Sequence, residues 1–215
     1  MGTIKVLGLG EVKFTPDVIR VKVLIEQVYA SYPQAFNAGV SNTNKIKDIL
    51  PPIGFDRDLV KTAMFEINKH HERERIGKDD YKWVHRGYAI KQRFTIDIEM
   101  GDPKLSALLC RIGEEMLGVE TELSFALSDI EGARQKLVEA AVKDALSKAE
   151  AMAAVLGKQL GEIKSLNYGV PEEHRYAKRH AYGLSEIACG SAEKMDFTPN
   201  NLEGSANVEA IWELL

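Results

Sequence analysis

Apolar residues recur every three or four positions between Asp129 and Leu156, which predicts one long α-helix over this stretch. Ser128 and Glu131 have the spacing of an N-terminal capping box, and Gly157 follows where a left-handed residue commonly ends a helix. The predicted buried arc consists of Ile130, Leu137, Val138, Ala141, Ala145, Ala149, Met152, Val155 and Leu156. Its many alanines predict a close approach to a flat surface, most simply a β-sheet.

Alternation of apolar and polar residues predicts β-strands in other segments. The clearest strand runs over 84–100 and follows a second long strand at 59–71, with the charged tip ERERIGKDDY between them. Both are longer than the usual strand of about five or six residues. We therefore expect a projecting β-hairpin arm at about 59–100. Shorter strands are expected at 4–9, 19–25, 123–127, 162–168 and 206–214.

Two further helices complete the expected elements. One runs from Ser31 to Leu50, where Ser31 and Gln34 form a capping box and Pro51-Pro52 ends the helix. The other opens at Asp102-Pro103.

The order of these elements, ββαββ-αβαββ, favours an α+β fold. We expect one domain over residues 1–215, in which three helices cover one face of a largely antiparallel sheet. Residues 171–200 show no periodicity and predict a long irregular loop.

The composition is ordinary for a soluble folded protein, with 45% hydrophobic and 28% charged residues among 215. The net charge of −4 argues against bulk attraction to polyanions, so nucleic acid is not expected as a partner. No apolar run reaches the ~18 residues of a membrane-spanning helix. The first residues lack the apolar core of a signal peptide, which predicts a cytoplasmic location, or a periplasmic one if the sequence was trimmed.

Several short motifs occur together in a characteristic order along the chain. In the first half they are Gly8-x-Gly10-Glu11-Val12, Pro16-Asp17 and Gly87-Tyr88. The long helix and the segment after it contribute Ala141, Ala145, Lys148-Ala149-Glu150, Leu156-Gly157 and Leu160-Gly161. The end of the chain contributes Thr198-Pro199, Gly204 and Val208-x-Ala210. In this order the motifs resemble the SIMPL-domain family of YggE-like proteins, and the resemblance covers nearly the whole chain.

This resemblance implies an α+β protein that assembles into ring-like or shell-like homo-oligomers. It also implies a link to oxidative-stress tolerance, because many bacterial members are periplasmic proteins or surface antigens for which that link is proposed. A mammalian relative is described as a signalling adaptor. The family has no established catalytic residues, so the resemblance assigns none to this chain.

The candidate ligand-binding motifs have simpler structural interpretations. Gly8-x-Gly10 is followed by a strand rather than the helix of a phosphate-binding loop, so we expect a bulge or tight connection there. His70, His71 and His85 come near one another if the hairpin pairs, but neighbouring residues of a strand point to opposite faces. We therefore predict solvated histidines, and no metal or cofactor.

Two exposed regions are the expected contact surfaces of the assembly. The segment 174–182 is basic with interleaved aromatic residues, a composition suited to a subunit contact, a solvated loop or a polyanion. The predicted contact residues are His174, Arg175, Tyr176, Lys178, Arg179 and Tyr182 in the loop, and Arg73, Arg75, Tyr81 and Trp83 in the arm.

The sequence favours a non-enzymatic, self-assembling structural protein whose main partner is itself. One alternative is an adaptor or binding module that recognises a protein or polyanion through the 171–200 loop. A second is a hydrolase or metal-binding enzyme, although no G-x-S-x-G elbow or Cys–His signature is present.

Overall fold

The computed structural model describes residues 2–77, 80–116, 118–169, 182–183 and 197–215. The chain divides into two compact units of discontinuous sequence. The first comprises Met1–Asp17, Phe125–Arg179 and Pro199–Leu215, and the second comprises Val18–Ser124 and His180–Thr198. Among the described helices, none combines the length and apolar character needed to cross a membrane.

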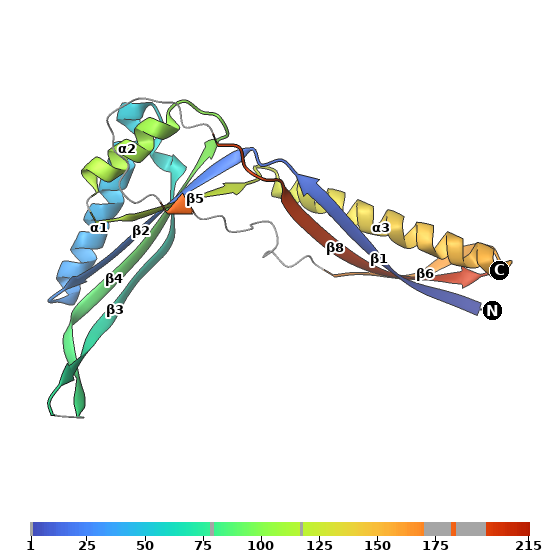
Figure 1. The fold of residues 1–215 in the computed structure, drawn as a ribbon, viewed down its shortest axis with the longest axis horizontal. Helices are drawn as coiled ribbons and strands as arrows, with labels where there is room; N and C mark the ends of the chain where they lie inside the picture. Colours follow the sequence, from blue (N-terminus) through green and yellow to red (C-terminus); the bar gives the residue numbers. More distant parts are fainter. Residues whose placement is uncertain (1, 78–79, 117, 170–181, 184–196) are drawn as a thin grey trace. The chain divides into compact units, whose positions relative to one another are not determined.

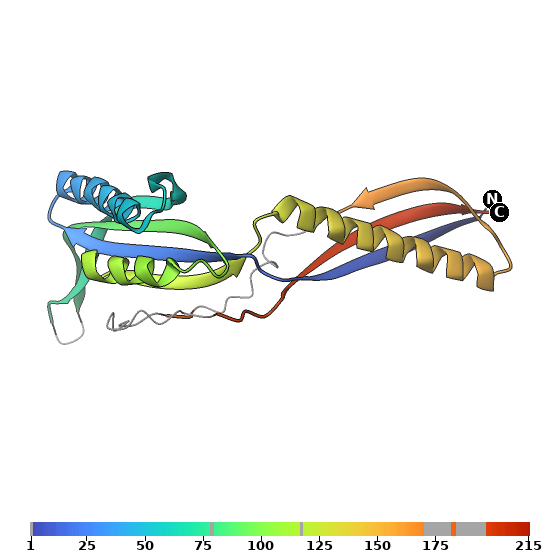
Figure 2. The same ribbon diagram turned by 90° about the horizontal axis from the view of Figure 1, so that it is seen from above.

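The first unit is a three-stranded antiparallel sheet covered by one helix. Its strands lie in the order β1 (Gly2–Phe14), β8 (Leu202–Leu214) and β6 (Leu160–Tyr168). The helix, α3 (Ile130–Val155), lies along β1 and β8 (Figure 2). Its position confirms the long predicted helix and the sheet expected beneath it.

Two glycines of β1 bring the backbone of α3 into contact with the sheet. A Cβ atom at Gly8 would lie 2.1 Å from the carbonyl oxygen of Ala141, and one at Gly10 would lie 2.3 Å from that of Leu137. The register of β1 with β8 runs unbroken through both glycines. The bulge or connection expected at Gly8-x-Gly10 is therefore wrong: these residues are glycine because a helix lies directly against them.

The buried stripe of α3 is narrower than predicted. It repeats every four residues and consists of Ala133, Leu137, Ala141, Ala145, Ala149 and Ala153. Ile130, Met152, Val155 and Leu156 were expected in the buried arc but are exposed, Val155 to 87%. A helix that approaches a sheet through small side chains touches it along a thin line, so positions off that line stay in solvent.

The N-terminal cap of α3 also differs from the expectation. Asp129 caps the helix by accepting a 2.7 Å hydrogen bond from the Gly132 amide. Ser128 instead donates its backbone amide and its hydroxyl to the Asp17 carboxylate, so the Ser128–Glu131 capping box is wrong. These bonds, the hydroxyl bond foremost, lower the pKa of Asp17. At the other end, Gly157 adopts the predicted left-handed conformation, with φ of 66°.

The second unit is a five-stranded sheet with two helices (Figure 1). The strands lie in the order β3 (Val60–Arg75), β4 (Tyr81–Glu99), β2 (Val18–Tyr29), β5 (Glu120–Ala126) and β7 (Tyr182–Gly183). Helix α1 (Tyr32–Ile49) packs on β2, β3 and β4, and α2 (Leu105–Glu115) packs beside α1. Short 3₁₀ turns at Pro51–Ile53 and Arg57–Leu59 connect α1 to β3. The predicted cap of α1 is present: the Ser31 amide donates to Gln34 Oε1.

A buried glutamine joins α1 to the sheet. Gln92 in β4 is only 1% exposed, and its side-chain amide donates to the Gly39 carbonyl oxygen at 3.0 Å and to Thr43 Oγ1 at 3.2 Å. Its carbonyl oxygen accepts from Asn42 Nδ2 at 3.2 Å. A fully bonded polar group in an apolar interface fixes the position of the helix, because any shift would leave buried groups unpaired.

The predicted α+β class, antiparallel pairing and element order are confirmed, with β7 as an additional short strand. The expected single helix-covered sheet is two sheets, one with α3 and the other with α1 and α2. The predicted loop at 171–200 lies outside the described residues except at 182–183 and 197–200.

Candidate functional site on the hairpin arm

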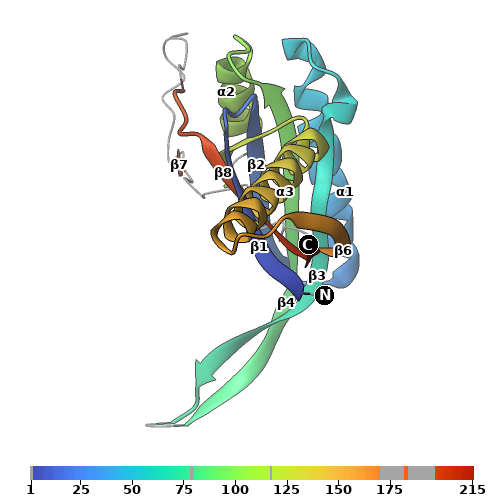
Figure 3. The same ribbon diagram turned by 90° about the vertical axis from the view of Figure 1, so that its right-hand side faces the viewer.

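The hairpin of β3 and β4 extends beyond the other strands of its sheet (Figures 1 and 3). Pairing between β2 and β4 ends at Tyr29 and Tyr88, whereas β3 and β4 stay paired as far as Arg75 and Tyr81. We call the two-stranded part, residues 70–86, the arm.

A β-bulge marks the base of the arm. His70 lies opposite Gly87, but His71 lies opposite His85, so β4 carries one extra residue at this point. Gly87 has φ of 138°, a conformation that side-chain-bearing residues rarely adopt. A Cβ atom there would lie 2.2 Å from the Tyr29 carbonyl oxygen. The bulge sets which residues of the two strands face each other beyond it.

One face of the arm, which we call the aromatic face, pairs basic side chains of β3 with aromatic side chains of β4. Register places His71 opposite His85, Arg73 opposite Trp83 and Arg75 opposite Tyr81. The Arg73 guanidinium lies 4.0 Å above the centre of the Tyr81 ring, a cation–π contact. The row continues toward α1 through Tyr88 and Tyr32, whose ring centres are 5.8 Å apart.

The opposite face of the arm, the ion-pair face, carries the carboxylates. Arg86 lies 3.5 Å from Glu72 and 3.1 Å from Glu74, and His70 Nε2 lies 3.3 Å from Glu72 Oε1. Exposed pairs of this kind contribute about 0–1 kcal/mol each. On this face the carboxylates lie beside cationic side chains. The aromatic face, in contrast, carries arginines beside exposed rings.

The structure brings the four predicted arm residues together. Arg73, Arg75, Tyr81 and Trp83 all lie on the aromatic face, and Trp83 is 67% exposed and Tyr81 48%. In the loop, His174, Arg175, Tyr176, Lys178 and Arg179 lie outside the described residues. The backbone of Tyr182 pairs with Leu123 in β5. The sequence analysis did not predict the pairing of His71 with His85, because the bulge at Gly87 sets that register.

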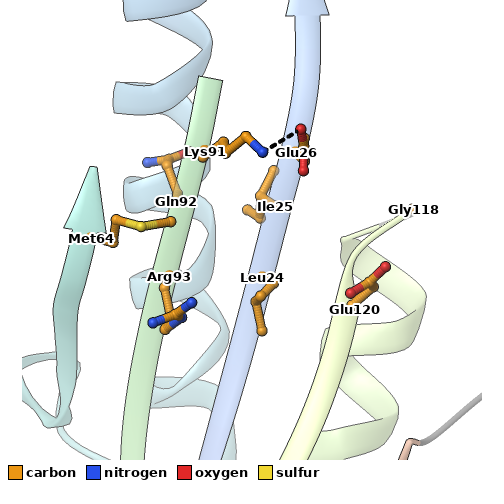
Figure 4. A pocket seen from close by; sticks show the side chains of 9 residues that line it. All are labelled: Leu24, Ile25, Glu26, Met64, Lys91, Gln92, Arg93, Gly118 and Glu120. Atoms are coloured by element: carbon orange, nitrogen blue, oxygen red, sulfur yellow. Dashed lines mark ion pairs between the residues drawn. The ribbon is translucent and has the colours of Figure 1, made fainter. Parts of the chain in front are cut away.

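A cavity of about 240 Å³ opens on the face of the five-stranded sheet turned away from α1 (Figure 4). Leu24, Met64, Arg93 and Glu120 project into it. Lys91 is held by Glu26 at 2.8 Å, whereas Arg93 and Glu120 have no ion pair within the described residues. These two opposite charges are the groups that a polar ligand could reach here.

Elsewhere on this face two ion pairs join neighbouring strands. Arg20 makes two 2.7 Å hydrogen bonds to Asp97, which raise the pKa of the arginine further. Lys22 lies 3.1 Å from Glu122. These two ion pairs distinguish this part of the face from the cavity, where Arg93 and Glu120 are not paired with each other.

The chain also matches a known protein family over nearly its full length. The model of the SIMPL family, described as a protein of unknown function (DUF541), matches residues 4–212. No curated protein matches the chain.

Proposed function

We propose that this chain, which belongs to the SIMPL family, is a non-enzymatic structural protein that assembles with copies of itself through the arm. The observation that carries the proposal is the exposed aromatic face on a ribbon of only two strands. A role in tolerance of oxidative stress is part of the proposal and rests on the family resemblance alone.

A two-stranded ribbon has little to stabilise it in water, because a hairpin needs a third strand or another packed element. Yet the arm exposes large apolar groups, with Trp83 at 67% and Ile76 at 65%. Tryptophan, tyrosine and arginine are the residues that most often dominate the binding energy of protein interfaces. The aromatic face supplies all three, in one row.

The outer edge of β3 offers a second mode of contact. β3 is the edge strand of its sheet, so half of its backbone amide and carbonyl groups point away from β4. Such an edge can accept a strand from another chain. A second copy could therefore add a strand along the outer edge of β3.

The test is the solution mass, measured by light scattering after size-exclusion chromatography at low and high salt. In the shortened-arm variant, Asn-Gly replaces residues 72–84, because His71 and His85 are directly paired and a two-residue turn can join them. We expect a discrete oligomer for the wild type and a lower mass for this variant, whose circular dichroism should still be that of a folded α+β protein. A monomeric wild type, or an unchanged mass in the variant, would overturn the proposal.

Point variants separate the two faces of the arm. Trp83→Ser should lower the oligomer mass, whereas Lys82→Ser, one residue away on the ion-pair face, should not. Equal effects of the two changes would contradict an interface on the aromatic face.

A second candidate function is a binding module for an acidic segment of another protein. The arginines of the aromatic face favour it, since Glu72 and Glu74 lie on the opposite face. In that case the wild type is a monomer, and Arg73→Ser weakens capture of a polyglutamate probe.

A further inference from the structure

Two histidines of the arm face each other directly across the strands. His71 in β3 is paired with His85 in β4, and their ring centres are 5.2 Å apart with 59° between the ring planes. Tyr88 packs edge-on against His85 at 5.3 Å and in turn contacts Tyr32 of α1. These contacts fix one imidazole of the pair from the base of the arm.

The ring nitrogens of this pair are available to a ligand. Within the described residues neither His71 nor His85 makes a hydrogen bond or an ion pair, and both side chains are exposed. His70 differs, because Glu72 on the ion-pair face engages its Nε2 atom at 3.3 Å. In β3, therefore, His70 is hydrogen-bonded whereas its neighbour His71 is not.

The separation of the two rings is that of two imidazoles on one metal ion. With zinc–nitrogen distances of about 2.0–2.1 Å and a tetrahedral angle, the two ring centres lie roughly 5 Å apart. We propose that His71 and His85 together bind a divalent transition-metal ion for which imidazole is a preferred ligand, such as Zn²⁺ or Ni²⁺. This proposal does not depend on self-assembly.

Water must complete the coordination shell. Among the described residues no group of three or more His, Cys, Asp or Glu side chains could hold an ion, and Glu72 and Glu74 lie on the other face. Structural zinc sites are closed by four protein ligands, so a two-ligand site binds more weakly and exchanges its ion. Such a site would join the two strands of the arm reversibly, and the fold would not depend on the ion.

Nearby cationic side chains repel the ion electrostatically but do not occupy its position between the two imidazoles. Lys69 and Arg73 lie two residues to either side of His71, on the same face. The Arg73 guanidinium is drawn over the Tyr81 ring, toward the tip of the arm and away from the imidazoles. Because salt screens the repulsion between exposed charges, affinity should increase slightly with ionic strength.

The experiment is a Zn²⁺ titration of the full, tag-free chain, followed by calorimetry and by NMR of the histidine ring protons, with Mg²⁺ as a control ion. We expect saturable Zn²⁺ binding that shifts the His71 and His85 resonances, and no response to Mg²⁺. His71→Ala and His85→Ala should each lower the affinity at least about tenfold, since each removes one of two ligands.

His70→Ala is the matched control, because it removes a neighbouring histidine from the opposite face. It should retain the wild-type affinity. The double change His174→Ala with His180→Ala covers the remaining histidines of the chain and should also retain it. Absence of Zn²⁺ binding, loss of binding in either control, or unchanged affinity in His71→Ala would overturn the proposal.

Discussion

The Oδ2 atom of Asp144 in α3 accepts a 2.7 Å hydrogen bond from the backbone amide of Leu9 in β1. Within the described sheet β1 pairs only with β8, so this amide points to a free edge. Lys148, one turn further along α3, bonds the same carboxylate at 2.6 Å and the Leu7 carbonyl oxygen at 3.4 Å. The helix thus covers backbone groups that would otherwise invite pairing with another chain.

This contact predicts a pH dependence. The bond from Lys148, and then that from the Leu9 amide, lower the pKa of Asp144. A carboxyl group whose pKa is lower in the folded state stabilises the fold above its unfolded pKa, and this contribution is lost as pH falls through the folded pKa. We expect the chemical shift of the Leu9 amide to follow the titration of Asp144, with an inflection below the ordinary aspartate pKa of 3.8.

The control for this titration is Asp144→Asn, in which the inflection should disappear. An inflection that persists in that variant, or a flat titration in the wild type, would contradict the bond.

The close packing of α3 on β1 predicts that Gly8→Ala is strongly destabilising. The new Cβ atom would collide with the Ala141 backbone, and overpacking of this kind costs about 1–3 kcal/mol or more. Urea unfolding of wild type and variant measures the difference. Gly2→Ala in the same strand is the control, since its nearest neighbour would be Leu214 at 3.8 Å. Equal stability of the two variants would contradict this packing.

The bulge at the base of the arm predicts a larger loss for Gly87→Ala than for Gly101→Ala. Both glycines have positive φ, which costs an alanine roughly 1–2 kcal/mol. At Gly101 nothing lies within 4 Å of the new atom, whereas at Gly87 it would collide with the Tyr29 carbonyl oxygen. Thermal unfolding measures the melting temperatures of both variants, and their difference reports the effect of the collision alone. Similar melting temperatures would show that the arm does not require this bulge.

The buried glutamine predicts a graded response to substitution. Gln92→Ala removes three hydrogen bonds and leaves a cavity, for an expected loss of about 2–4 kcal/mol. Gln92→Met keeps the volume, and the Gly39 carbonyl oxygen still accepts from Thr43 Oγ1, so the loss should be smaller. Denaturant unfolding ranks the two. A methionine variant that is as destabilised as the alanine variant would show that the bonds to Gln92, and not its volume, dominate.

Local patterns in the sequence predicted most of the elements of the fold. The repeat of apolar residues from 130 to 155 is a property of one helix, and the alternation in β4 is a property of one strand, so neither needs information from elsewhere. For the same reason the sequence placed Arg73, Arg75, Tyr81 and Trp83 on a projecting hairpin. Alternation puts Arg73 and Arg75 on one face of β3, and Tyr81 and Trp83 on one face of β4, but only the register beyond the bulge makes these the same face of the arm.

The tertiary structure decided everything that depends on pairing between distant segments. In the sequence alone Gly8 and Gly10 indicate a break in a strand, but in the structure α3 lies against them. Ser128 has the sequence position of a helix cap, but its hydroxyl donates to Asp17 instead. The division into two sheets follows from the pairing of Gly2 with Leu214, at opposite ends of the chain. His71 faces His85 only because β4 carries one extra residue, Arg86, next to Gly87. Such contacts arise from packing and register, which only the folded chain specifies.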